Sequence, residues 1–324
     1  MGKLLKGLFR SKEIVVILLI VAIFLILSLA SGTFLNATVF ESLQTSIAPS
    51  AIISAGMMIL LISGVFDLSV GSVMGLAGAL TAILAAGGVP VVYAILVGLA
   101  TGLVFGLVNG GLVAFAGVNP LITTLGTMYI GRGLVNAFMR GERRYGVVVK
   151  APDFLAIGQG KILGIYNMFW IMLIIVLVAQ VITMKMKAGR RLYYIGSNYQ
   201  AARLVGIKVK KIRVIAFTLC GLLAAFTGIL VTSYMGTSSI ILGTNVELQI
   251  IISCLIGGAS ISGGQGLVVG SLLGVIFMTM VSAIFNILEI GIYWQNIIVG
   301  IILVFIVGLD AFLVSRRKKA LGEI

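Results

Sequence analysis

Ten apolar stretches, each bounded by charged or turn-forming residues, constrain the fold of this chain more than any other feature. They lie near residues 14–31, 47–65, 69–86, 91–115, 121–139, 167–184, 214–235, 246–258, 267–287 and 294–314. Most have about the 20 residues that an α-helix needs to cross a bilayer. Because lipid offers the backbone no hydrogen-bond partners, such segments must be helical. The sequence therefore predicts an all-α, polytopic membrane protein with about ten transmembrane helices.

The composition supports this class and excludes others. Apolar residues make up 60% of the chain and charged residues 10%, far from the usage of soluble proteins. The net charge of +14 comes from short loops beside the apolar stretches, and no segment is large enough for a nucleic-acid-binding domain. With no histidine and two cysteines, metal clusters and Cys/His or Ser/His catalysis are excluded. Cys220 and Cys254 are expected to be small core residues.

The basic residues also predict the orientation. An even number of spans puts both termini and the loop 185–213 on one side, and their lysines and arginines assign that side to the cytoplasm. The first apolar stretch has no small-x-small cleavage site and is expected to be a retained helix. Residues 140–166 are basic yet fall outside on this count. They either meet an extracytoplasmic partner or show that the count is wrong by one span.

Two of the predicted spans are short or broken by glycine. The third follows Asp67-Leu68-Ser69-Val70-Gly71, and the eighth ends at Gly257-Gly258 before a loop rich in serine and glycine. These two breaks resemble each other weakly, with matches Gly64/Gly257, Ser69/Ser262 and Gly71/Gly264, followed by Gly102/Gly270 and Gly106/Gly274. In transporters such symmetry brings broken segments together near the pathway. We expect two pseudo-symmetric halves, residues 1–140 and 167–324, although chance similarity of glycine-rich helices is the alternative.

The loop 185–213 combines charge with a compact local structure. From residue 184 onward it carries nine lysines and arginines and no acidic residue. Ser197 and Gln200 have the spacing of a capping box, and Gly206 stands where a helix end favours a left-handed residue. We predict a helix of about two turns over 198–205, suited to dock a soluble partner. The alternative is a solvated loop that only fixes topology.

Asp67 is the acidic residue with the strongest constraint. A carboxylate at the bilayer centre costs about 2.5–3.5 kcal/mol. Asp67 is expected to cap the half-helix after the first break, and a role in gating or substrate contact is the alternative.

Gly98, Gly102, Gly106 and Gly110 recur every four residues, so they should let a neighbouring helix approach closely. Asn109, next to this stripe, must find a hydrogen-bond partner within the bundle or line a polar path.

Uncharged polar residues near the breaks are candidates for a solute pathway. Hydroxyls and amides without charge suit a neutral, hydrogen-bonding solute such as a sugar. Together with the acidic Asp67, the candidates are Ser69, Asn109, Asn119, Thr123, Thr124, Asn286, Gln295 and Asn296. Each alone is more often used in helix packing.

One short segment resembles a motif of ATP-hydrolysing proteins. Residues 261–265, ISGGQ, nearly match the LSGGQ motif of ABC-type ATPases, but the chain has no phosphate-binding loop of the form G-x-x-x-x-G-K-[ST]. We therefore expect no ATP hydrolysis, no catalytic residue and no bound cofactor in this chain.

Together these segments resemble the permease subunits of ribose-type ABC sugar importers, in the branched-chain amino acid/sugar inner-membrane permease superfamily. The resemblance covers nearly the whole chain and rests on FDLSVGS (66–72), NPLITTLGTM (119–128), GRRLYYIGSNYQAARLVGI (189–207), IGGASISGGQG (256–266) and YWQNIIVGIILVFIVGLD (293–310). It implies that residues 1–324 form one permease domain in the inner membrane of a prokaryote, with a cytoplasmic coupling loop at 185–213.

The resemblance also implies partners and roles. The segment QAARLVGI is similar to the helix that docks on the ATPase, which makes Ser197, Gln200, Ala201, Ala202, Arg203 and Gly206 the candidate coupling residues. Implied partners are an ATPase subunit that uses ATP and Mg²⁺, often with both ATP-binding domains fused, an extracytoplasmic sugar-binding protein and a second permease chain, identical or related. An ion-coupled secondary transporter or channel is the alternative. Such carriers usually place paired charges in mid-membrane, whereas this chain offers only Asp67 near a break.

Overall fold

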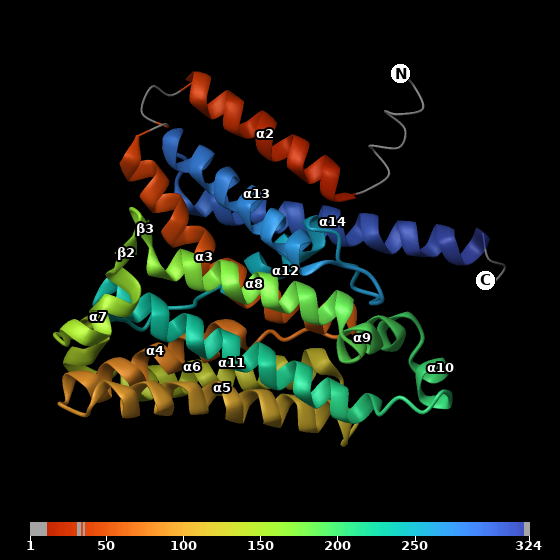
Figure 1. Ribbon diagram of the computed structural model, residues 1–324, viewed down its shortest axis with the longest axis horizontal. Helices are drawn as coiled ribbons and strands as arrows, with labels where there is room; N and C mark the ends of the chain where they lie inside the picture. The colour runs from red at the N-terminus through yellow and green to blue at the C-terminus, as the bar shows by residue number, and fades with distance from the viewer. Residues whose placement is uncertain (1–11, 31–33, 35, 321–324) are drawn as a thin grey trace.

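The computed structural model describes residues 12–30, 34 and 36–320 and consists almost entirely of helices (Figure 1). Each of the ten predicted apolar stretches forms a helix, which confirms the fold class. These helices are α2 (Lys12–Ala30), α3 (Ala37–Ile62), α4 (Val70–Ala86), α5 (Val91–Ala114), α6 (Pro120–Phe138), α8 (Asn167–Lys185), α11 (Val209–Met235), α12 (Val246–Ile256), α13 (Val268–Ile287) and α14 (Ile292–Ala320).

Within the described residues, six of these helices have the length and apolar composition of a membrane span: α3, α5, α8, α11, α13 and α14. The helices α2, α4 and α12 are apolar but shorter. α6 has 19 residues, as many as α8, but it is rich in threonine and glycine and is not among these apolar helices. As predicted, the helices beside the two breaks are short, with 17 residues in α4 and 11 in α12.

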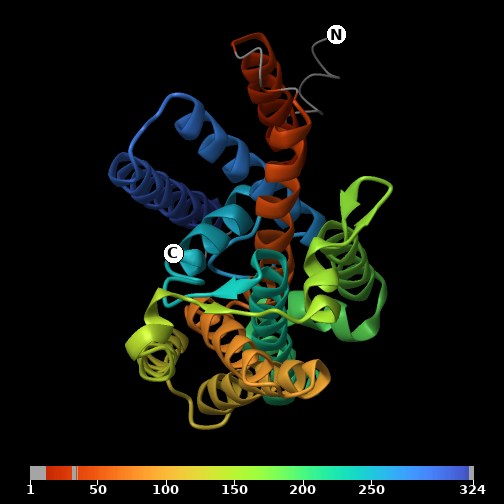
Figure 2. The same cartoon turned by 90° about the vertical axis from the view of Figure 1, so that its left-hand side faces the viewer.

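Helix α3 forms the centre of the bundle. Residues 51–62 are all buried, and they pack against α8, α11, α12 and α13. Helix α11 packs against α3, α4 and α5 (Figures 1 and 2). In α14, no residue of the span Tyr293–Phe312 is buried. Cys220 and Cys254 are buried, as expected for core residues.

The glycine stripe of α5 packs against α11, which confirms its predicted packing role. A Cβ atom on Gly102 would fall on the carbonyl oxygen of Gly221 in α11, and one on Gly106 would meet the backbone of Thr218. Gly270 and Gly274 of α13 instead pack against α12. The predicted equivalence of the two glycine pairs is therefore wrong. Gly102 and Gly106 lie on α5, the second helix after the first break, whereas Gly270 and Gly274 lie on α13, the first helix after the second break.

The two ends of the bundle differ in structure. One end carries α9 (Lys187–Ser197) and α10 (Tyr199–Leu204), together with the start of α2 and the end of α14 (Figure 1). The opposite end carries η1 (Gly141–Tyr145), α7 (Pro152–Gln159) and the short strand pairs β1 (Val147–Val148) with β4 (Thr237–Ser238) and β2 (Lys161–Ile162) with β3 (Ile165–Tyr166). Residues 140–166 and 185–213 therefore lie at opposite ends of α8, in line with the prediction that one span separates them.

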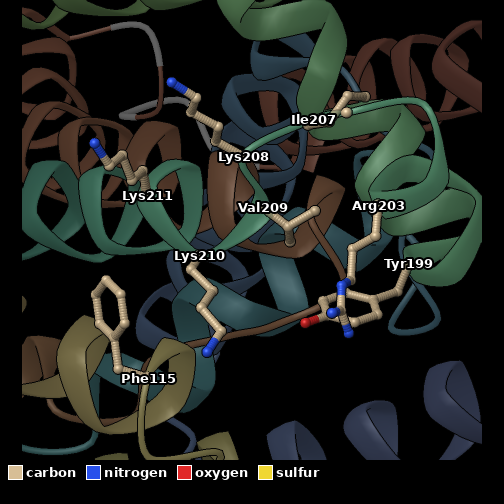
Figure 3. Close-up of a pocket in the computed structure, with 9 residues that line it drawn as sticks. Phe115, Tyr199, Arg203, Ile207, Lys208, Val209, Lys210 and Lys211 are labelled. Atoms are coloured by element: carbon tan, nitrogen blue, oxygen red, sulfur yellow. The ribbon is translucent and has the colours of Figure 1, made fainter.

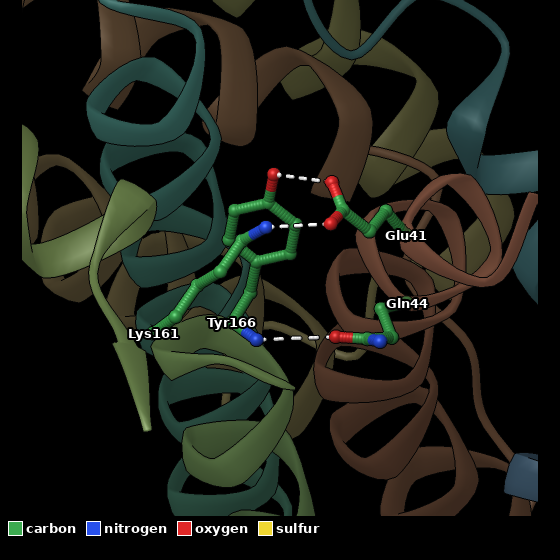
Figure 4. Close-up of polar contacts among 4 residues, drawn as sticks. All are labelled: Glu41, Gln44, Lys161 and Tyr166. Atoms are coloured by element: carbon green, nitrogen blue, oxygen red, sulfur yellow. Dashed lines mark hydrogen bonds and ion pairs between the residues drawn. The ribbon is translucent and has the colours of Figure 1, made fainter. Parts of the chain in front are cut away.

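The hairpin of β2 and β3 is fixed to the first turns of α3. Lys161 Nζ lies 2.6 Å from Glu41 Oε1, and the Tyr166 hydroxyl donates to Glu41 Oε2 at 3.1 Å (Figure 4). The backbone N–H of Tyr166 donates to the Gln44 side chain at 3.1 Å. The hydrogen bond to Glu41 raises the pKa of Lys161 above its ordinary value. This group anchors the basic segment 140–166 to the core helix at the end opposite α10.

Candidate functional site

Helix α10 forms where the sequence predicts it, but with a different N-cap. The side chain of Asn198 accepts a hydrogen bond from the N–H of Ala201 at 2.9 Å, whereas Ser197 is the last residue of α9. The capping-box assignment to Ser197 is therefore wrong, because the helix of α9 continues through that residue and the chain becomes extended only at Asn198. Gly206 has a φ of +79°, as predicted for the residue that ends the helix.

The exposed face of α10 differs from the predicted set. Of the candidate coupling residues, only Ala202 is buried, where it packs with Ile195 and Val209. The others are exposed: Ser197, Gln200, Ala201, Arg203 and Gly206. Leu204 and Val205 were not among the candidate coupling residues, yet they are 88% and 75% exposed. Two consecutive apolar residues before a helix-ending glycine, in an otherwise basic loop, were the available signal.

A basic cavity of about 460 Å³ lies beside α10 (Figure 3). It is open to solvent and bordered by the end of α5, by α10 and by the start of α11; its lining residues are Phe115, Tyr199, Arg203, Gly206, Ile207, Lys208, Val209, Lys210 and Lys211. The Arg203 guanidinium lies 5.9 Å from the centre of the Tyr199 ring, and Lys210 Nζ lies 5.6 Å from that of Phe115. This surface suits acidic side chains of a partner that contacts α10.

Helix α9 connects α10 directly to both breaks. Gly264 N–H, in the loop after α12, donates to the Ile62 carbonyl at the end of α3 at 2.9 Å. A Cβ atom on Gly263 would lie 2.8 Å from Gly64 Cα and 3.0 Å from Gly196 Cα. We call this contact of Gly64, Gly196 and Gly263 the glycine junction. It confirms that the two broken segments meet, and it adds α9 as a third participant that the repeat did not reveal.

The loop after α12 is held from two further sides. The Tyr193 hydroxyl of α9 donates to the carbonyl of Gly266 at 2.8 Å. The Asp310 carboxylate of α14 accepts from Ser260 Oγ at 2.9 Å and from the N–H of Ile261 at 3.1 Å. Residues 260–266 therefore serve as a contact surface between spans. No role for Asp310 is predicted from the sequence, because nothing local connects it to a loop 50 residues earlier.

Asp67 belongs to a buried polar cluster at the first break. Asp67 Oδ1 accepts from the N–H of Ser69 at 2.7 Å and from its hydroxyl at 2.6 Å. Asn109 Nδ2 donates to Ser69 Oγ at 2.9 Å, and the Thr127 hydroxyl donates to Asn109 Oδ1 at 2.8 Å. Because Ser69 precedes α4, Asp67 closes a turn before the helix instead of capping its first turn. The cluster ties α4, α5 and α6 together.

Replacing Asp67 tests the structural role of this cluster. In Asp67→Leu the buried N–H and hydroxyl of Ser69 lose their acceptor, which costs about 1–3 kcal/mol for each. We expect the purified protein to unfold at a clearly lower temperature in detergent, whereas Asp67→Asn, which keeps one carbonyl oxygen, should lose less. Asp153→Leu, at an exposed site on α7, is the matched control. Wild-type stability of Asp67→Leu, with loss of transport, would favour a gating role.

The remaining pathway candidates do not lie together around one common site. Thr123 and Thr124 of α6 donate to carbonyls of their own helix, and Asn119 accepts from the N–H of Leu121. Asn286, Gln295 and Asn296 lie on α13 and α14, on the other side of the bundle (Figures 1 and 2). Gln295 donates to the carbonyl of Ile290 at 2.9 Å.

A further charged residue inside the bundle was missed. Arg132 of α6 donates to the carbonyl of Leu242 at 2.8 Å and to that of Gly243. It thereby fixes the loop that leads into α12, whose first turn contains the buried Glu247. The single arginine within α6 was the available signal, since a charge inside a predicted span needs a partner.

Comparison with known proteins identifies relatives over most of the chain. Residues 38–307 match the family described as "Branched-chain amino acid transport system / permease component". A probable ABC transporter permease protein of Sinorhizobium fredii, y4mJ, is 37% identical over 86% of this chain and 83% of its own length. The ribose import permease protein RbsC of Escherichia coli is 33% identical over 96% of this chain and 95% of its own length.

A third relative has a different printed role. The autoinducer 2 import system permease protein LsrC of Shigella flexneri is 29% identical over 98% of this chain and 92% of its own length. No solved structure matches the chain.

Proposed function

The chain belongs to the family of branched-chain amino acid transport system permease components, and from this membership we propose that it is the membrane-spanning permease subunit of an ATP-driven importer for a ribose-like sugar. The observation that supports a coupled importer most directly is the continuity of α10 with the breaks. An exposed, capped helix with Leu204 at its surface leads through α9 to the glycine junction. The ATP hydrolysis itself would occur in a separate subunit.

The path from α10 inward suggests how the partner's motion reaches the spans. The ATPase subunit, with ATP and Mg²⁺, would receive α10 in a surface cleft and place acidic side chains near the cavity of Arg203 and Lys210. Since α9 touches both Gly64 and Gly263 through backbone contacts, a displacement of α9 would move the ends of α3 and α12 together. A second permease chain, identical or related, would complete the transporter.

The protein is a multi-pass protein of the inner membrane, as the family and the six apolar helices indicate. For its orientation we propose that α9, α10 and both termini face the cytoplasm. The nine basic residues of the α9–α10 region support this. Residues 140–166 would then face outward, where an extracytoplasmic sugar-binding protein could contact them.

The nature of the solute is inferred from the relatives and from chemistry. RbsC is named for ribose and LsrC for autoinducer 2. The bundle of this chain also carries uncharged hydroxyl and amide groups, such as those of Asn286 and Gln295, which suit a neutral solute with many hydroxyl groups.

Purification with partners tests the proposal. The tagged chain would be extracted from native membranes in mild detergent, and stoichiometric partners would be identified by mass spectrometry. We expect an ABC-type ATPase that is lost when residues 200–206 are replaced by a glycine-serine linker. A chain that purifies alone and transports in liposomes without ATP would establish an ion-coupled carrier or channel instead.

A further inference from the structure

A polar cavity of about 290 Å³ lies between α3, α12 and α13. It is lined by Ser42, Leu43, Ser46, Ser50, Gln249, Thr279, Ser282, Ala283 and Asn286. Seven of these nine side chains carry a hydroxyl or amide group, and none carries a charge. On α3 the three serines recur every four residues, so they share one helix face.

The hydroxyls of this cavity differ from other hydroxyls in the bundle. Within the part of the chain that the structure describes, Ser28, Ser54 and Thr218 each donate to a carbonyl three or four residues earlier in their own helix. By contrast, six side chains that line the cavity make no hydrogen bond to another described residue: those of Ser42, Ser46, Ser50, Gln249, Thr279 and Ser282. The backbone carbonyls of Ser42 and Gln249 do accept, from the hydroxyls of Thr45 and Ser253. Because an unpaired hydroxyl is costly in lipid, these groups require water or a polar solute.

The polar residues of the cavity become less exposed along α3 in the direction of the breaks. Ser42 and Ser46 are exposed, Ser50 is half-buried and Thr279 is buried. One turn further, Ser54 Oγ donates to Ser271 Oγ of α13 at 3.2 Å, and both residues are fully buried. α3 ends at Ile62, whose carbonyl binds Gly264 in the loop after α12. We call Ser42, Ser46 and Ser50 the serine stripe. This stripe, the buried pair Ser54–Ser271 and the glycine junction follow one another along α3 and just beyond its end.

We propose that this stripe is a binding subsite for a neutral, polyhydroxylated solute, and that the Ser54–Ser271 pair closes its inner end. The inference rests on the proposed function, because it assigns the solute's place within the permease. The hydroxyls of Ser46, Ser50 and Thr279 and the amide of Gln249 would exchange hydrogen bonds with solute hydroxyls. Movement of α3 relative to α13 at the glycine junction would separate Ser54 from Ser271 and open the way inward.

Thiol labelling tests whether the stripe is open to water, independently of the solute. Ser46→Cys, made in the full transporter, should react with a charged, membrane-impermeant methanethiosulfonate added from outside. Val178→Cys, on the exposed apolar side of α8, is the control that should stay unlabelled. The native Cys220 and Cys254 are buried and should not contribute. Failure of Ser46→Cys to react in correctly inserted protein would overturn the proposal.

Uptake measurements test whether the solute uses the stripe. Thr279→Val keeps the side-chain shape and removes the hydroxyl, so the maximal rate of ribose uptake should fall about tenfold, the value of one lost hydrogen bond. Thr218→Val, whose hydroxyl bonds within its own helix, should retain the wild-type rate. If the wild type transports ribose, and if both Thr279→Val and labelled Ser46→Cys transport it equally fast, the subsite is excluded. The proposed function as an importer would be unaffected by that result. If the wild type transports no ribose, the proposal that the solute is a ribose-like sugar fails. Labelling of Ser46→Cys then decides alone whether the stripe is accessible to water.

Discussion

In membranes that contain the assembled transporter, Leu204→Glu is expected to abolish uptake without loss of the permease from the membrane. Leu204 is 88% exposed at the end of α10, and surface substitutions usually change stability by no more than about 0.5 kcal/mol. Once α10 is docked in a partner's cleft, however, a carboxylate there would be buried without a counter-charge. That costs about 3–5 kcal/mol, which corresponds to at least about a hundredfold weaker binding.

The measurement combines uptake with co-purification of the ATPase. Leu204→Met, which keeps an apolar side chain of similar volume, is the matched control and should assemble and transport normally. Ala202→Glu is a less informative change, because Ala202 is buried against Ile195 and Val209 and a carboxylate there would disrupt α10 itself. Normal transport by Leu204→Glu at normal expression would remove α10 as the docking element.

Gly196→Ala is expected to uncouple the transporter at the glycine junction. The new Cβ atom would fall on the carbonyl oxygen of Ile62 and beside the N–H of Gly264, which form a hydrogen bond with each other. Inserting an atom into packed structure costs about 1–3 kcal/mol. Because both neighbours are backbone atoms, α9 must move away from the breaks. We expect uptake to fall at least about tenfold.

The control for this variant is Gly111→Ala on α5. No heavy atom lies within 4 Å of a Cβ atom built at Gly111, and alanine favours a helix over glycine by about 1 kcal/mol. Gly111→Ala should therefore transport at the wild-type rate. ATP hydrolysis by the purified complexes is the second measurement: Gly196→Ala should still hydrolyse ATP but without transport. Wild-type uptake by Gly196→Ala would show that α9 does not act through the junction.

Much of the fold follows from local properties of the sequence. All ten apolar stretches became helices, and the two breaks, the short α10 and the left-handed Gly206 lie where the sequence predicted them. The errors concern finer positions. Ser197 was assigned the N-cap that Asn198 occupies, because both residue types cap helices well and only the end of α9 selects between them.

The candidate site was less predictable. Neither the exposure of Leu204 nor the burial of Ala202 follows from a six-residue segment, since the orientation of α10 is set by its packing against Ile195 and Val209. The serines of α3 likewise have no local signature: Ser54 bonds within its own helix and to α13, whereas Ser46, two turns earlier, faces the cavity.

Three features follow from local sequence alone: the chain spans the membrane as helices, these helices break at two places, and a capped helix lies in the basic loop. These features depend on hydrogen bonding and burial within one segment. The close contacts of the glycines, in contrast, become visible only in the folded protein. Gly110 packs against α11 while Gly111 meets nothing, and Gly64, Gly196 and Gly263 come together from segments more than 60 residues apart. A glycine has no side chain to indicate its neighbour, so the rotation and crossing of the helices alone determine what approaches it.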